Sequence, residues 1–294
     1  MPPLFVGFCH WMQEHRGAKD ETLKAYGRIV LDALQTLGED PQQFNPARLR
    51  AFVLDRAPRH GRSKAKLVVT TLRTFIRYLI AQGACPVGLD TAIPTVAGWR
   101  LASLPRYLPA TDIERILATC DPSTVRGARE RAILLLLARM GLRVGDICNM
   151  RLADIDWEQG TLKVCGKSHR DVLLPLSQEV GDALRHYLAT ARSATSCDRL
   201  FLRKLPPLTG AVNPSGIARI VQRSIRRAGV SAPTHGTHLL RNSAATALLG
   251  QGASLESIAV LLRHNSLDTT TRYAKVDFKV LRQLARPWPE ISPC

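Results

Sequence analysis

The chain has 294 residues, of which 45% are hydrophobic, so it is long enough for two domains that each bury a core. Its 41 lysines and arginines outnumber 24 acidic residues, and the formal net charge of +17 points to a polyanionic partner. The alternative is a basic surface without a partner. Aromatic residues make up only 5%, which argues against a single-strand binder that stacks bases on aromatic side chains.

Residues 1–85 are predicted to form a helical domain. Turns are expected at Gly17, at Gly38–Pro41 and at Pro58–Gly61, because glycine and proline interrupt the helical pattern there. Within this domain the stretch Lys64–Gln82 shows the helical pattern best, since apolar side chains recur at helical spacing along it.

The same stretch carries a run of positive charge, and the residues expected to contact DNA are Lys64, Lys66, Arg73 and Arg77. Between Arg56 and Arg106 the only acidic residue is Asp90. Such a basic stripe suits the phosphate backbone of DNA. A solvated helix face is the alternative interpretation, although such faces usually carry charges of both signs.

Residues 86–106 contain several prolines and glycines and are predicted to be an interdomain linker, followed by a second domain over residues 107–294. A buried helix is expected over Ala128–Met140, ending at Gly141. Two strands, Thr161–Cys165 and Asp171–Leu176, are expected to be joined by a turn. Since the pattern is helical again after them, the predicted fold is mainly α with a small antiparallel β-sheet.

Chemistry-bearing residues gather in the last third of the chain. The run Thr237–Arg241 opens a predicted helix and places His238 and Arg241 three residues apart on one face, near the positive end of the helix. A further helix ends before Arg263-His264, and Tyr273 follows nine residues after His264. Each piece alone is weak, because a His-x-x-Arg pair arises often by chance and a lone histidine is usually structural.

The full set is more specific than its parts. Six residues of fitting type occur in order, each in a fitting local structure: Arg143, Lys167, His238, Arg241, His264 and Tyr273. This constellation resembles the tyrosine recombinase (phage integrase) family, with a spacing similar to that of the bacterial Xer recombinases. The resemblance is clear over about residues 107–277, and the preceding helical domain resembles the family's core-binding domain.

The resemblance implies a role for each of these residues. Tyr273 would be the nucleophile, Arg143 and Arg241 the phosphate clamps, Lys167 the general acid, and His238 and His264 the supporting pair. Guanidinium groups are planar, always charged and bidentate, so they can meet the negative charge that develops on a phosphate without a metal ion. The phosphotyrosyl bond conserves the energy of the broken phosphodiester, so no ATP or other cofactor is expected.

Two positions depart from the family pattern. Asp146 stands where the family commonly has Glu, and Arg263 replaces the common Gly before the second histidine. Asp146 is expected to orient Arg143, and Arg263 is expected to add positive charge close to the DNA.

The resemblance also implies the reaction and its partners. The chain would cleave double-stranded DNA at a specific target site through a 3′-phosphotyrosyl intermediate and exchange strands through a Holliday junction. A homotetramer on synapsed DNA is expected, and a partner recombinase is an open possibility. Two alternatives also stay open: a non-catalytic helix-turn-helix DNA-binding protein, and a monomeric type IB enzyme that relaxes DNA.

The remaining features concern location. The seven cysteines are scattered, without a CxxC pair for zinc, as expected of thiols in a reducing cytosol. The longest apolar run, Ala132–Ala138, is far shorter than the roughly 18 residues of a membrane span, and the apolar patch Leu4–Cys9 lacks the basic leader of a signal peptide. We therefore expect a cytoplasmic, nucleoid-associated protein without a membrane partner.

Overall fold

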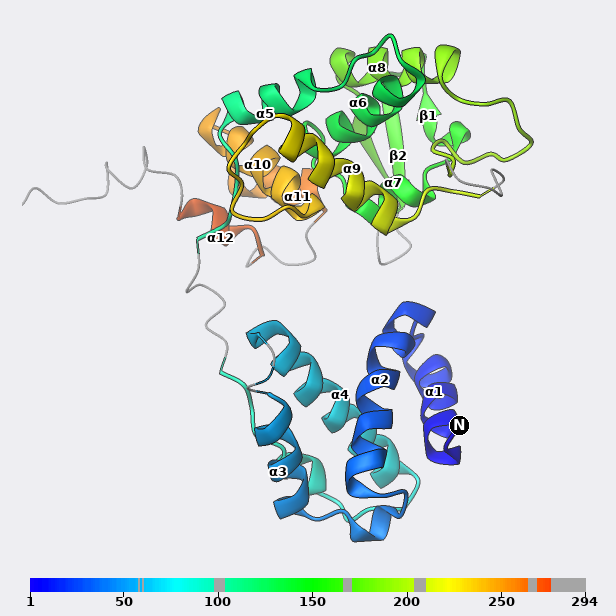
Figure 1. Ribbon diagram of the computed structural model, residues 1–294, viewed down its shortest axis with the longest axis vertical. Helices are drawn as coiled ribbons and strands as arrows, with labels where there is room; N and C mark the ends of the chain where they lie inside the picture. The colour runs from blue at the N-terminus through cyan, green and yellow to red at the C-terminus, as the bar shows by residue number, and fades with distance from the viewer. Residues whose placement is uncertain are drawn as a thin grey trace, which may run out of the picture. The chain divides into compact units, whose positions relative to one another are not determined.

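The computed structural model describes residues 1–57, 59, 61–97, 104–165, 171–203, 210–263 and 269–275. The chain divides into two compact units, Met1–Arg100 and Leu101–Cys294 (Figure 1). The predicted boundaries at 85 and 107 stay predictions. Within the predicted linker, Leu89 and Ile93 are buried in the hydrophobic core of the first unit.

The first unit is a bundle of helices (Figure 1). Its elements are α1 (Pro3–Arg16), α2 (Asp20–Leu37), the 3-10 turn η1 (Pro41–Gln43), α3 (Pro46–Arg56), α4 (Arg62–Ala81) and the 3-10 turn η2 (Leu89–Ala92). Local sequence sets several ends: α1 stops at Gly17, whose φ of 55° favours glycine, and the Asn45 side chain caps α3 by accepting from the Arg48 amide at 3.0 Å.

Helix α4 supplies much of the core of this unit. Its side chains Phe75 and Ile76 are fully buried, and the Phe75 ring meets the Phe8 ring of α1 edge to face with 5.4 Å between centroids. The predicted helical pattern over residues 64–82 is therefore confirmed as a core-forming helix.

The second unit contains more helices and a small sheet. Its elements are α5 (Ala110–Ala118), α6 (Val125–Ala138), α7 (Val144–Asn149), the 3-10 turn η3 (Leu152–Asp154), β1 (Ile155–Asp156), β2 (Thr161–Cys165), β3 (Asp171–Pro175), α8 (Gln178–Thr190), α9 (Pro214–Arg227), α10 (Thr237–Gly250), α11 (Leu255–Leu262) and α12 (Thr271–Ala274).

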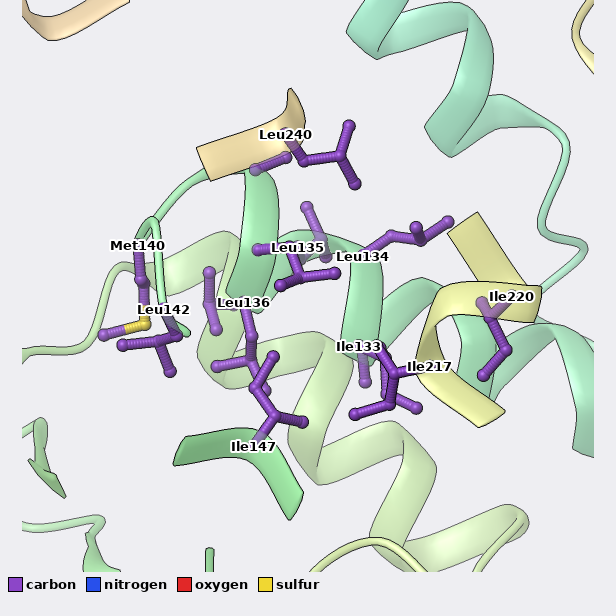
Figure 2. Close-up of a cluster of buried hydrophobic side chains, with 14 of the residues drawn as sticks. Ile133, Leu134, Leu135, Leu136, Met140, Leu142, Ile147, Ile217, Ile220 and Leu240 are labelled. Carbon is purple, nitrogen blue, oxygen red and sulfur yellow. The ribbon is translucent and has the colours of Figure 1, made fainter. Parts of the chain in front are cut away.

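Helix α6 lies at the centre of this unit. Its five consecutive residues 133–137 are completely buried, because an apolar run without a polar face can be satisfied only inside a protein. Figure 2 shows Ile133 near Ile217 and Ile220 of α9, and Leu135 near Leu240 of α10. The chain leaves α6 through Gly141, which has a φ of 58°. The predicted buried helix and its glycine stop are confirmed.

The sheet is antiparallel in the order β1-β2-β3. Leu162 pairs with Leu174 and Val164 with Val172, so alternate side chains of β2 enter the core. The two predicted strands are confirmed, and β1 is an addition that its two-residue length hides from pattern analysis. The predicted turn between β2 and β3 lies outside the described residues.

Two observations bear on partners and cofactors. Among the described residues, no helix combines the length and apolar content that crossing a membrane requires. In the same residues, no three His, Cys, Asp or Glu side chains gather closely enough to hold a metal ion. The metal independence of the chemistry is a prediction that the experiments below address.

Candidate active site

Arg241 lies in the second turn of α10 and is only 3% exposed. Its guanidinium donates hydrogen bonds to the carbonyl of Gly141, in the turn after α6, and to the carbonyl of Leu262, at the end of α11. A Cβ at Gly141 would lie 2.6 Å from the Leu262 side chain, so a larger residue here would displace that side chain. One buried cation thus ties together three segments that are distant in sequence.

Arg143 precedes α7 and is half-buried. Its Nη2 donates to the carbonyl of Arg263 at 2.6 Å, next to the Leu262 carbonyl that Arg241 contacts. The two predicted phosphate clamps therefore meet at consecutive carbonyls. Burial, and then the positive charge of Arg143, lowers the pKa of Arg241 to about 10.

The guanidinium groups of Arg143, Arg241 and Arg263 repel one another at this separation, and a bound anion would relieve the repulsion. Burial, and then the charge of Arg263, also lowers the pKa of Arg143. Both guanidiniums keep their charge at neutral pH, and a guanidinium has five N–H donors, of which the hydrogen bonds named above use one on Arg143 and two on Arg241. The arrangement suits an anion with several oxygens, such as a phosphodiester.

His238 opens the same helix as Arg241; its side chain is accessible to solvent, although neighbouring atoms remove part of its hydration. Its pKa is lowered, first by desolvation and then by the charges of nearby arginines. These are Arg241, Arg272 and Arg143. A lowered pKa leaves the imidazole neutral at pH 7, so His238 can accept a proton or a hydrogen bond from a neighbouring group.

Tyr273 lies in the short helix α12 and is 2% exposed. It belongs to a small cluster of buried side chains with Ala245, Ile258 and Leu262, and its hydroxyl donates to Oδ1 of Asn242 at 2.9 Å. Burial raises the pKa of Tyr273, while the charges of Arg272 and Arg241 act to lower it. The phenol is therefore protonated at rest and lies within the electrostatic reach of the arginine clamp.

Four of the six predicted residues are thus brought into one region: Arg143, His238, Arg241 and Tyr273. Lys167 and His264 lie outside the described residues. Asn242 was missed by the sequence reasoning, although a signal exists. It directly follows Arg241 in the helix that carries the predicted site residues, it is buried, and buried polar groups need partners.

Asp146 was predicted to orient Arg143, and its carboxylate contacts the backbone of Arg143 rather than the guanidinium. Its Oδ2 accepts a hydrogen bond from the backbone amide of Arg143 at 2.9 Å and pairs with the guanidinium of Arg263. The Arg143 guanidinium bonds to the Arg263 carbonyl instead.

The four predicted DNA contacts of the first unit lie on α4. Lys64 and Arg77 are exposed, whereas Lys66 and Arg73 are half-buried. The Arg73 guanidinium donates to the Ile93 carbonyl at 2.8 Å, and Arg77 pairs with Asp90 at 2.7 Å. At about 100° per residue, Lys66, Arg73 and Arg77 lie within about 40° of one another around the helix, whereas Lys64 points to the opposite side.

A helix-turn-helix interpretation fits part of the geometry, since α10 and α11 are joined by a turn at Gln251 and Gly252. It does not account for Arg241, because that side chain is buried on carbonyls of the protein itself.

The fold and this cluster of arginine, histidine and tyrosine define an enzyme class that acts on phosphodiesters. Residues 106–279 match the Phage integrase family. The integrase/recombinase y4rA of Sinorhizobium fredii is 39% identical over 282 residues, which cover 95% of this chain and 69% of that protein. Tyrosine recombinase XerC of Thermodesulfovibrio yellowstonii is 29% identical over 282 residues, covering 94% of this chain and 92% of the relative.

Solved structures share the fold. The XerH site-specific recombinase bound to palindromic difH substrate has a TM-score of 0.77 at 21% identity, covering 97% of this chain and 85% of that one. A lambda integrase tetramer bound to a Holliday junction has a TM-score of 0.71 at 19% identity, covering 98% and 79%. The chain belongs to the phage integrase family and is a tyrosine recombinase, an enzyme that cleaves and rejoins DNA.

Proposed function

We propose that this recombinase exchanges strands at a specific duplex site with Tyr273 as the nucleophile. The observation that supports the proposal most is the meeting of Arg143 and Arg241 at the carbonyls of Arg263 and Leu262, because the charge of Arg241 also acts on the pKa of Tyr273. A phosphate bound by the two guanidiniums would lie close to the tyrosine hydroxyl.

In the proposed step, the Tyr273 oxygen attacks phosphorus, and the bond between phosphorus and the 5′-oxygen breaks. The phenolic proton passes to a neutral base, for which His238 is suited by its lowered pKa. The 5′-oxygen leaves with a proton from Lys167, and His264 supports the phosphate. Rejoining reverses these transfers with the 5′-hydroxyl of another strand as the attacking group.

We assign double-stranded DNA as the substrate and a homotetramer on two synapsed sites as the active assembly, with a Holliday junction between the two rounds of strand exchange. The structural similarity to a lambda integrase tetramer on such a junction supports this assignment. We also place the protein in the cytoplasm in association with the nucleoid, where its substrate lies. A second recombinase could supply some of the four subunits of this assembly.

A nicked suicide substrate tests the reaction. We expect a protein–DNA adduct that survives denaturation, with Tyr273 in the labelled peptide, and formation of the same adduct in excess EDTA, since arginines rather than a metal hold the phosphate. Loss of the adduct under chelation, with DNA binding intact, would contradict the mechanism. Relaxation of a supercoiled plasmid without exchange between two sites would favour the monomeric relaxing enzyme.

We further propose that Lys64 contacts the DNA backbone. Replacing Lys64 with Ala should weaken binding about equally for target and unrelated duplexes and reduce the slope of log affinity against log salt by about 1, because one phosphate contact is lost. Binding titrations over a salt series measure both effects. Arg73→Ala is the comparison: its guanidinium holds the Ile93 carbonyl, so it should lower the melting temperature of the protein as well. A loss confined to the target sequence in Lys64→Ala would contradict the backbone contact.

A further inference from the structure

Residue 263 has an unusual backbone for its side chain. Arg263 ends α11 with a φ of 52° and a ψ of 51°, and it is the sole non-glycine residue with positive φ in the described part of the chain. L-residues other than Asn and Asp rarely adopt this left-handed conformation, and glycine is the residue that favours it at a helix end. An arginine that persists here needs a compensating contact.

The compensating contact is a buried ion pair. The Arg263 side chain is 5% exposed, and its Nη2 bonds to Oδ2 of Asp146, which is itself 11% exposed. Its Nε and Nη1 are buried and have no hydrogen-bond partner within the described residues. Buried donors without partners are costly, so the pairing with Asp146 is the contact that holds this side chain inward.

The hydrogen-bond partners of Arg143 and Arg263 differ from those that local sequence spacing suggests. Asp146 lies three residues after Arg143, close enough for a direct pair between the two side chains. Instead, the Arg143 guanidinium donates to the Arg263 carbonyl, while the Arg263 guanidinium binds Asp146. Residue 263 thus contacts the start of α7 twice, through its carbonyl and through its side chain.

We propose that Arg263 is a positioning residue that occupies the Asp146 carboxylate and so keeps the guanidinium of Arg143 available for the scissile phosphate. Without Arg263, the carboxylate would be left buried beside Arg143 with its principal cation removed. An unpaired buried carboxylate is costly, so Asp146 would pair with the Arg143 guanidinium. That pair would neutralise the positive charge that binds the phosphate. This inference rests on the proposed function, in which Arg143 binds that phosphate.

The proposal predicts opposite effects on stability and on activity. Arg263→Gly removes the strained backbone of an L-residue, so the melting temperature should stay at or above that of the wild type. Single-turnover cleavage of a nicked suicide substrate at saturating DNA should nevertheless fall by about 10- to 100-fold. DNA affinity should change less than about 3-fold, since most phosphate contacts lie elsewhere. A residue with only a structural role would lose stability and activity together.

The pairing with Asp146 is tested by a second substitution. Asp146→Asn removes the charge that would capture Arg143, so the double variant Arg263→Gly/Asp146→Asn should cleave faster than Arg263→Gly alone. Arg263→Lys keeps the positive charge next to Asp146 and should retain more activity than Arg263→Gly. The matched control is the exposed pair Arg151–Asp198, whose Nη1 and Oδ2 atoms are 2.6 Å apart. The same cycle, Arg151→Gly with Asp198→Asn, should leave the cleavage rate unchanged.

The outcomes separate this inference from the function on which it rests. If the wild type forms no covalent adduct, the proposed function fails first. If the wild type forms the adduct and Arg263→Gly cleaves within about 2-fold of it, the positioning role is overturned. Strictly multiplicative rates in the double variant would also overturn it, because independent residues do not rescue one another.

Discussion

Replacing Tyr273 with Phe should abolish covalent attachment to DNA while leaving DNA binding intact. The substitution removes the oxygen proposed to attack phosphorus and keeps the ring that belongs to the buried cluster of Ala245, Ile258 and Leu262. It also leaves Oδ1 of Asn242 without the hydroxyl donor at 2.9 Å, which should cost about 1–3 kcal/mol of folding stability. A suicide substrate measures the adduct, binding titration measures affinity, and thermal unfolding measures the stability cost.

Tyr187→Phe is the matched control. Tyr187 is also buried in the second unit, and its hydroxyl donates to the Leu200 carbonyl at 3.3 Å. The control therefore loses a comparable hydroxyl and hydrogen bond without touching the nucleophile, and it should form the adduct at the wild-type rate. An adduct that persists in Tyr273→Phe, or that maps to Tyr107 or Tyr187, would overturn the assignment of the nucleophile.

Replacing Arg143 with Lys should reduce cleavage on the order of 100- to 1,000-fold, although the charge is kept. An ammonium cannot hold the Arg263 carbonyl and two phosphate oxygens with the fixed fork of a guanidinium. DNA affinity should fall far less, since one contact among many is altered. Single-turnover cleavage at saturating DNA, compared with binding titrations, separates the two effects.

Arg151→Lys provides the comparison for this variant, because Arg151 is an exposed arginine of the same unit that pairs with Asp198. It should cleave at the wild-type rate. An equal loss of affinity and of cleavage in Arg143→Lys would assign Arg143 to DNA binding alone.

Local patterns predicted much of the fold. The apolar run of α6 and the alternation of β2 and β3 depend on neighbours in sequence, so their bounds could be predicted to within a few residues. The phase of α4 could also have been worked out, because two residues of separation rotate a helix by about 200° and place Lys64 opposite Lys66. Arg73 and Arg77 fall on the side of Lys66, so three of the four predicted DNA contacts share one side of the helix.

The candidate site was predictable in composition and order but not in its contacts. Spacing suggested that Asp146 would orient Arg143, and its carboxylate does bond to the Arg143 amide, but its ion-pair partner is Arg263, which lies more than a hundred residues further along the chain. The burial of Tyr273 and of the neighbouring Thr270 could not be predicted from the sequence either. It depends on the packing of α11 and α12 on α10, which no local pattern encodes.

The central position of α6 has a consequence for the accuracy of the site. Arg143 immediately precedes α7 and Arg241 lies on α10, and both of these helices pack on α6. Arg143 and Arg241 are therefore both positioned relative to α6, and the 97 residues between them need not transmit their spacing along the chain. Positional errors in the intervening loops and strands do not accumulate in the distance between the guanidiniums. A site assembled from residues that are distant in sequence can thus be positioned as precisely as a site built on a single helix or strand.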